Sequence, residues 1–215
     1  RGYRAVKMKI EPGFDLEAVL PVRERFPTLA IGIDANGSYT WDERESLLRL
    51  DALGITYIEQ PFAPLDLEAH RRLRDETVAA VAIDEPIDSI EDAVKVVEEG
   101  AADLLVVKPA RLGPEACRTI HDLALAAGLR VKASGLLETS IGRAHTLAIA
   151  TLPGAIHSDL AVAGDFLETD PVTPHIGMTA GRFLPLPSAG IGCEPDEAAI
   201  APYIVRESGR FSGAG

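Results

Sequence analysis

Short apolar runs typical of β-strands recur along the chain at intervals of about 25 residues. Several of them, such as AVAID and DLLVVKP, are too uniformly apolar for a sheet that has one face in water. They are typical of strands buried on both faces. Seven strands are predicted, over residues 5–10, 29–34, 55–59, 78–84, 104–108, 129–134 and 155–159.

Amphipathic stretches with helix signals lie between these runs. Thr40 is placed to cap a helix over 41–53, which ends at Gly54. Ser89 is placed to cap another over 90–100. Such alternation indicates a parallel sheet covered by helices, either an open doubly wound sheet or a closed (β/α)8 barrel. The barrel is favoured, because no Gly-rich phosphate-binding loop follows any strand.

The two ends of the chain depart from this repeat. Residues 183–215 are rich in Pro, Gly and Ala and lack periodicity, so they are expected to be a loop-rich segment, either disordered or packed on an upstream segment. The chain begins with Arg1 and soon enters a strand-like run, which suggests that an upstream portion is missing. We therefore predict a barrel over 1–182 that lacks its first strand, followed by a separate C-terminal segment.

Charged residues follow five of the predicted strands at equivalent positions. Lys9, Asp34, Glu59 and Asp84 are spaced 25 residues apart, and Lys108 follows 24 residues later. Active sites of (β/α) barrels are built at the carboxyl ends of the strands. If the missing strand is the first, the two lysines lie on opposite sides of the barrel, with the three carboxylates between them.

Three carboxylates on neighbouring strands would repel one another without a cation between them. Hard oxygen ligands without His or Cys favour Mg²⁺ over zinc, with Mn²⁺ as a substitute. We therefore predict a magnesium site at Asp34, Glu59 and Asp84. A nearby cation and partial burial favour the neutral form of a lysine, which is a base. Lys7 has the same strand parity as Lys9, so it should also face inward.

Composition restricts the partners of the chain. Its 215 residues are 47% hydrophobic, enough for a substantial core, and its formal net charge is −12. Nucleic acids and anionic membranes are therefore disfavoured, and a small molecule is the expected partner. The spacing of Cys117 and Cys193 indicates neither a disulfide framework nor a metal site, which fits a cytoplasmic location. No apolar run approaches the roughly 20 residues that cross a bilayer.

The same residues resemble the muconate-lactonizing subgroup of the enolase superfamily across essentially the whole chain. The matching motifs are KMK at 7–9, DAN at 34–36, EQP at 59–61, DEP at 84–86 and KP at 108–109. The run SGLLETSIGRAHTLAIATLP over 134–153 is most similar to the o-succinylbenzoate synthase and N-succinylamino acid racemase group. This group usually has a second Gly and a Met in the loop, where this chain has Ser134 and Leu136 or Leu137.

The resemblance implies removal of a proton α to a carboxylate, through an enediolate that Mg²⁺ stabilises. In a synthase, Lys9 would take the proton and deliver it to the leaving hydroxide, while Lys108 stabilises the enediolate as a cation. In a racemase, the two lysines would each serve one face of the α-carbon. The resemblance also implies an N-terminal capping domain over the barrel mouth, on which residues 183–215 would pack.

Further residues have open assignments. Asn36, Gln60 and Glu85 either contact substrate and orient ligands or cap loop backbone. Gly135 begins a loop that could bind a carboxylate tail through backbone N–H groups, and Asp159 resembles a further residue of the rim. Four further residues have no expected catalytic role. Glu138 is expected to cap a helix, and Arg143 and His145 to pack or form salt bridges. Lys132 has inward parity but lies deeper, and it stays unassigned.

Three functions remain open on the sequence alone. The first is an o-succinylbenzoate synthase of menaquinone biosynthesis, and the second is a racemase or epimerase of N-acylamino acids or dipeptides. The third is a barrel fragment without activity, retained for assembly or left by processing. Residues so similar do not separate the first two, and the sequence carries no direct sign of oligomeric state, so a homo-oligomer stays open.

Overall fold

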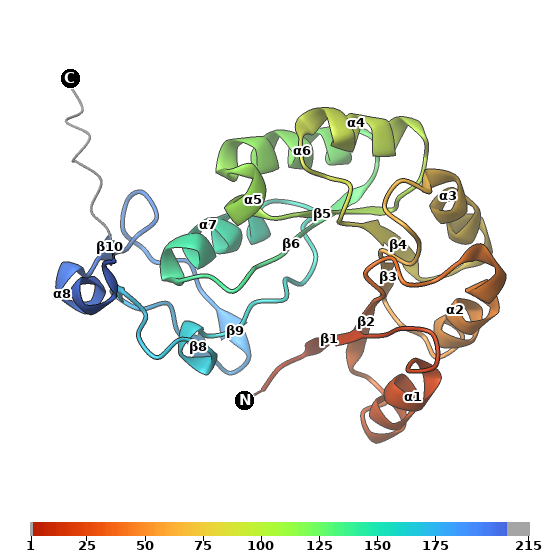
Figure 1. The fold of residues 1–215 in the computed structure, drawn as a ribbon, viewed down its shortest axis with the longest axis horizontal. Coiled ribbons are helices and arrows are strands. Elements are labelled where there is room, and N and C mark those ends of the chain that lie inside the picture. The colour runs from red at the N-terminus through yellow and green to blue at the C-terminus, as the bar shows by residue number, and fades with distance from the viewer. Residues whose placement is uncertain (1, 206–215) are drawn as a thin grey trace.

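Six parallel strands form one curved sheet in the computed structural model, which describes residues 2–205. The strands follow one another in chain order, and helices cover the outer side of the sheet (Figure 1). This confirms the predicted alternation. The strands are β1 (Ala5–Lys9), β2 (Ala30–Asp34), β3 (Tyr57–Glu59), β4 (Ala80–Ile83), β5 (Leu104–Val107) and β6 (Arg130–Ala133).

Helices connect the strands, and two helical segments begin at the predicted caps. Thr40 and Glu43 form a capping box, and Ser89 accepts a hydrogen bond from the backbone N–H of Asp92. The helices are α1 (Leu16–Arg25), η1 (Trp41–Glu43), α2 (Arg44–Asp51), α3 (Leu67–Glu76), α4 (Ile90–Glu98), α5 (Pro109–Leu112), α6 (Pro114–Ala126) and α7 (Ser140–Ala150).

The main core lies between the sheet and these helices. Strand residues such as Ile31, Ile33 and Val131 pack there against helix residues such as Leu47 and Ile120. A smaller cluster fills the inner face of the sheet and consists of Tyr57, Ala80, Ala82, Leu104 and Val106. Both faces are therefore buried, as the uniformly apolar strands indicate.

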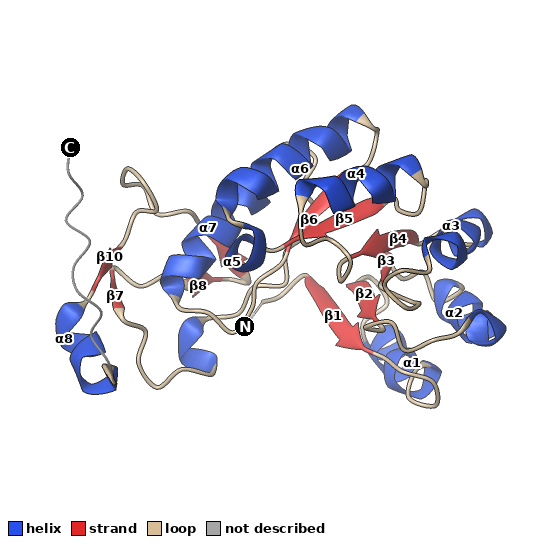
Figure 2. Cartoon of the chain, turned by 45° about the horizontal axis from the view of Figure 1, so that its top comes forward, coloured by secondary structure: helices blue, strands red, loops and turns tan. Residues whose placement is uncertain are grey.

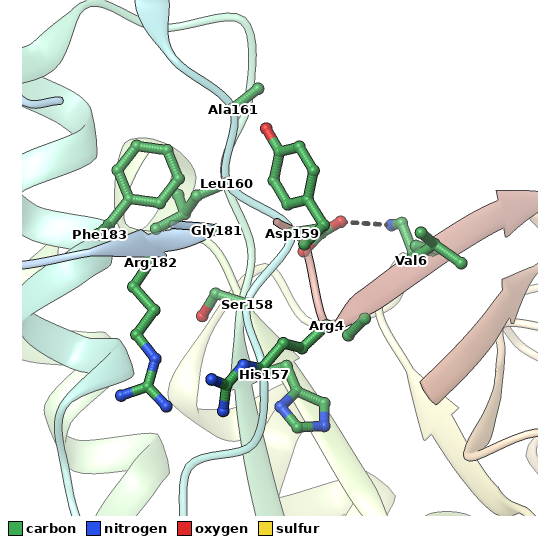
Figure 3. Close-up of a pocket in the computed structure, with 13 residues that line it drawn as sticks. Arg4, Val6, His157, Ser158, Asp159, Leu160, Ala161, Gly181, Arg182 and Phe183 are labelled. Carbon is green, nitrogen blue, oxygen red and sulfur yellow. Dashed lines mark ion pairs between the residues drawn. The ribbon is translucent and has the colours of Figure 1, made fainter. Parts of the chain in front are cut away.

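The expected closed barrel is not seen, and the sheet remains an open half-barrel. It begins at β1 and ends at β6 (Figure 2). The predicted strand over 155–159 is reduced to isolated parallel bridges that pair Ala155 with Val131 and Asp159 with Ser134. The outer edge of β1 has no strand partner within residues 2–205. A cavity of about 670 Å³ separates this edge from residues 157–161 instead (Figure 3).

The C-terminal part folds beside α7. β7 (Val172–Thr173) pairs antiparallel with β10 (Glu194–Pro195), and β8 (Met178–Thr179) pairs with β9 (Arg182–Phe183). The short helices η2 (Ala163–Asp165), α8 (Glu197–Ile200) and η3 (Ala201–Tyr203) complete the described residues. The boundary at residue 183 and the docking of this segment on a capping domain stay predictions, and residues 206–215 lie outside the described part.

Cys117 and Cys193 are both buried and free, as small buried residues should be. None of the helices within residues 2–205 is long and apolar enough to cross a bilayer.

Candidate active site

The register of the sheet brings the predicted site residues to one edge. Lys9 is the register partner of Asp34, and Asp34 is the register partner of Glu59. Register partners in parallel strands point to the same face, so these three side chains share the inner face. Asp84 follows β4 directly and Lys108 follows β5, at the same carboxyl edge.

The chain leaves two of these strands through strained residues. Asn36 and Gln60 adopt left-handed backbone conformations, with φ of 46° and 40°. Such conformations in residues other than glycine are uncommon and cluster at functional sites. They turn the chain directly after Asp34 and Glu59, which keeps both carboxylates at the edge of the sheet.

Gln60 braces the neighbouring turn. Its side chain is fully buried, and its Oε1 accepts hydrogen bonds from the backbone N–H groups of Asp84 and Glu85 at 3.1 and 3.2 Å. Its Nε2 lies 3.2 Å from Nε2 of His70, whose Nδ1 is 2.7 Å from the Asp66 carbonyl oxygen. Of the two expected roles, the structure favours capping of loop backbone, which orients Asp84 indirectly.

A cavity of about 530 Å³ gathers most of the predicted site. Glu59 and Gln60 are fully buried and do not line it, and Glu85 connects to it through a hydrogen bond of 2.8 Å from Nδ2 of Asn36. The predicted residues that line the cavity are Lys7, Lys9, Asp34, Asn36, Asp84, Lys108, Ser134, Gly135, Leu136 and Asp159.

Each lysine at this edge pairs with a carboxylate. Nζ of Lys9 lies 2.6 Å from Oδ2 of Asp34 and donates to Oδ1 of Asn36 at 2.6 Å. Lys108 donates to Oδ2 of Asp84. Lys7 has the most partners: Oδ2 of Asp34 and Oε1 of Glu59, both at 2.9 Å, and Oδ2 of Asp159 at 2.8 Å.

These contacts shift the pKa values of the buried groups. Burial alone would raise the pKa of Asp34, but the charges of Lys7 and Lys9 outweigh it and lower that pKa to about 2. Burial would lower the pKa of Lys7, yet the surrounding carboxylates, Glu59 first, raise it. For Glu59, burial outweighs its lysine partners and raises the pKa. Asp34 and Lys7 are therefore charged at neutral pH.

The donor set fits a magnesium ion in its chemistry. Asp34 and Glu59 already converge on one cation, because Nζ of Lys7 lies 2.9 Å from an oxygen of each. Oε2 of Glu85 is buried and has no hydrogen-bond partner among the described residues. Lysine ammonium groups lie between the carboxylates, and within residues 2–205 no three His, Cys, Asp or Glu side chains are grouped closely enough to hold a metal. The triad therefore stays a prediction.

Other residues of the site were missed or left unassigned. Lys132 is fully buried and pairs with Glu59 and Asp159; its inward parity was visible, but its partners were not. Arg111 donates to the backbone oxygens of Asp84 and Ile87 at 3.0 and 2.7 Å and so braces the same turn as Gln60. Nothing in the local sequence marks Arg111, because the turn that it binds lies 24–27 residues away.

The loop and helix after β6 supply one wall of the cavity. Arg143, for which only a packing or salt-bridge role is predicted, is buried yet lines the cavity, and it donates to the backbone oxygens of Glu138 and Ala161. Its guanidinium carbon lies 4.8 Å from the ring centroid of Phe166, which also lines the cavity. The expected cap role of Glu138 is replaced by a contact of 3.3 Å with Thr146 inside α7.

Comparison with known proteins identifies the family. The sequence profile of the enolase C-terminal domain-like family matches residues 1–199. The chain belongs to this family. Among curated members, the o-succinylbenzoate synthase of Geobacillus kaustophilus is 38% identical over 206 residues, covering 94% of this chain and 55% of that protein. The N-succinylamino acid racemase of Thermus thermophilus is 42% identical over 195 residues, covering 89% and 52%.

Solved structures give the same assignment for this enolase-like chain. An enolase-superfamily protein from Listeria innocua superposes with a TM-score of 0.87 at 31% identity, covering 94% of this chain and 55% of that one. Muconate lactonizing enzyme from Pseudomonas putida gives 0.87 at 26% identity, covering 94% and 58%. The predicted resemblance is confirmed. The chain spans about half the length of the curated relatives that it matches.

Proposed function

We propose that this chain forms the proton-transfer site of an enolase-superfamily enzyme that removes a proton α to a carboxylate, and that its reaction is the dehydration that yields o-succinylbenzoate in menaquinone biosynthesis. One observation carries the proposal: Lys9 and Lys108 line one cavity and flank Asp34 and Asp84 within it. A base and a cation on two sides of a carboxylate cluster are suited to proton removal next to a bound carboxylate.

Asp34, Glu59 and Asp84 are the residues that would hold Mg²⁺, with Mn²⁺ as a substitute. When bound, the ion supplies Lewis-acid stabilisation of the negative charge that develops on the substrate carboxylate. Asn36 and Glu85 position Lys9 beside this cluster, because Asn36 accepts a hydrogen bond from Nζ of Lys9 and donates one to Glu85.

The protein side chains move the protons. Lys9 in its neutral form takes the α-proton and then delivers it to the departing hydroxide, so that water leaves and a carbon–carbon double bond forms. Lys108 remains a cation and stabilises the charged intermediate from the other side. The loop of Ser134, Gly135 and Leu136 lines the same cavity and is placed to contact the remainder of the substrate.

Racemisation of an N-succinylamino acid is the second candidate. It is favoured by the same flanking lysines, since one can take the α-proton from one face of the carbon and the other can return it to the opposite face. The 42% identity to the Thermus racemase also supports it. A small-molecule carboxylate is the proposed partner in both cases, and a cytoplasmic location and a homo-oligomer stay expectations.

The test compares both reactions in the purified protein, with Mg²⁺ and with a chelator. Dehydration of the synthase substrate should require the metal and fall by about 10²–10⁴-fold in Lys9→Ala, as is typical for loss of a general base. The Lys9 side chain is 62% exposed, so this change should leave folding intact. Lys95→Met, on the outer helix α4, is the matched control.

Full activity in Lys9→Ala would refute the mechanism. Exchange of the α-proton with solvent deuterium in N-succinylamino acids, without dehydration, would favour the racemase. A folded protein that catalyses neither reaction would support the third possibility, a barrel without catalysis.

A further inference from the structure

Lys132, like Lys7, is an interior lysine that the proposed mechanism does not use. Four of the five lysines of the chain, at positions 7, 9, 108 and 132, face the inner side of the sheet, whereas Lys95 lies on the outer helix α4. The Lys132 side chain is fully buried. A buried ammonium group is costly unless it is paired and hydrogen-bonded, so its partners define its role.

Lys132 belongs to a closed ring of four alternating charges. Its Nζ donates to Oε2 of Glu59 at 3.1 Å and to Oδ1 of Asp159 at 2.7 Å. The second oxygens of the same two carboxylates pair with Lys7, Oε1 of Glu59 at 2.9 Å and Oδ2 of Asp159 at 2.8 Å. The ring is neutral as a whole, and it joins β1, β3, β6 and residues 155–159 across the interior.

Within the ring, the two oxygens of Glu59 bind different lysines, Oε1 binding Lys7 and Oε2 binding Lys132. Oε1 shares the Lys7 ammonium group with Oδ2 of Asp34, so it faces the neighbouring carboxylate of the cluster. Oε2 is held by Lys132 on the β6 side. Within the described residues, the ion pairs of Lys132 are with Glu59 and Asp159, so it does not compete for Asp34 or Asp84.

The aromatic side chain of Tyr57 restricts the position of the Lys132 ammonium group. Nζ lies 5.5 Å from the centroid of the Tyr57 ring, within the range of a cation–π contact. Tyr57 is itself packed in the cluster on the inner face of the sheet. The ammonium group is therefore fixed by two carboxylates and an aromatic ring.

We propose that Lys132 is a positioning residue for metal binding: by holding Oε2 of Glu59, it presents Oε1 beside Asp34. The inference rests on the proposed function, in which Glu59 is a metal ligand. Partners that orient metal ligands typically change metal affinity by about 10–100-fold when they are removed. Coulomb repulsion alone predicts the opposite change in metal affinity, because loss of the positive charge of Lys132 would strengthen cation binding.

The test measures Mn²⁺ affinity from the electron paramagnetic resonance signal of the free ion, and Mg²⁺ affinity by calorimetry. Lys132→Met should weaken Mn²⁺ binding by about 10–100-fold. Lys95→Met removes the same charge from the outer surface and should leave the affinity unchanged. Circular dichroism confirms folding before each titration.

A second pair of variants keeps the test decisive if Lys132→Met does not fold. Asp159→Asn retains the contact between Lys132 and Glu59, and Lys132→Met with Asp159→Asn restores the neutrality of the ring without that contact. We expect the double variant to bind Mn²⁺ about 10–100-fold more weakly than Asp159→Asn. A purely structural role for Lys132 would lower the melting temperature of the double variant without this change in affinity.

Two negative outcomes are distinct. Equal Mn²⁺ affinities of the double variant and Asp159→Asn, in a protein whose unmodified form binds the ion, would overturn the role of Lys132 alone. Failure of the unmodified, folded protein to bind Mn²⁺ or Mg²⁺ would overturn the proposed metal site itself.

Discussion

An alanine at Gly32 is expected to destabilise the protein, because the missing Cβ leaves room for the Tyr57 ring. Gly32 and Tyr57 are register partners on β2 and β3. A Cβ at residue 32 would lie 2.5 Å from the Tyr57 hydroxyl oxygen and closer still to two ring carbons. Tyr57 is 5% exposed and packs within the inner cluster, so the ring cannot move away freely.

The magnitude follows from two opposing effects. Overpacking of a filled core costs about 1–3 kcal/mol. Replacement of Gly by Ala in a strand recovers about 0.5–1 kcal/mol of backbone entropy. Gly32→Ala should therefore lower the free energy of unfolding by up to about 2.5 kcal/mol. In a Tyr57→Leu background the clash disappears, and the same change should be neutral or slightly stabilising.

Urea unfolding of the unmodified protein, Gly32→Ala, Tyr57→Leu and the double variant gives the coupling free energy between residues 32 and 57. We expect about 1–3 kcal/mol, the size of the overpacking cost alone. Gly177→Ala is the matched control, since a Cβ at that position has no atom within 4 Å. Equal effects of Gly32→Ala in the unmodified protein and in the Tyr57→Leu background would refute the packing argument.

Three further predictions concern the turn at Asp84 and the titration of His70. Gln60→Leu removes the acceptor of two backbone N–H groups and should lower the free energy of unfolding by about 1–3 kcal/mol for each buried donor left unpaired. Hydrogen exchange at the amides of residues 84 and 85 should become faster, and unchanged exchange would contradict the role of Gln60. Arg111→Met should loosen the same turn, so its effect on stability should not add to that of Gln60→Leu in a double-mutant cycle. Burial lowers the pKa of His70 below its usual 6.5. Just under pH 6.5 the unfolded chain therefore binds more protons at this residue than the folded chain does. The free energy of unfolding should fall as pH falls, by at most about 1.4 kcal/mol per pH unit. Urea titrations at several pH values should show a shallower slope in His70→Gln, and an unchanged slope would exclude His70 as the source.

The position of the site was predictable because it depends on local pattern and register. A residue that ends a buried parallel strand lies at the carboxyl edge of the sheet, and the constant spacing of Lys9, Asp34 and Glu59 placed them at equivalent ends. Helix starts at Thr40 and Ser89 were equally local, since each cap bonds a residue three positions away.

Closure of the barrel was not predictable in the same way. Residues 155–159 lie where the repeat predicts a strand, yet a strand forms only where a neighbouring backbone supplies its hydrogen bonds. β6 supplies some of them through isolated bridges, and the cavity beside β1 supplies none. Side-chain partners such as those of Gln60 were likewise hidden, because a buried amide can serve the substrate or the backbone with the same sequence signal.

The effect of replacing one charged residue inside the half-barrel depends on the other charged residues that it contacts. Each member of the ring has two partners, so removal of one charge leaves two oppositely charged atoms unpaired, whereas removal of an opposite pair leaves the remaining groups still paired. Lys7 also binds Asp34, so its loss would take one lysine partner from three carboxylates, while loss of Lys132 would take one from two. Lys7 is therefore the less replaceable of the two, and Lys132→Met should cost less stability together with Asp159→Asn than alone.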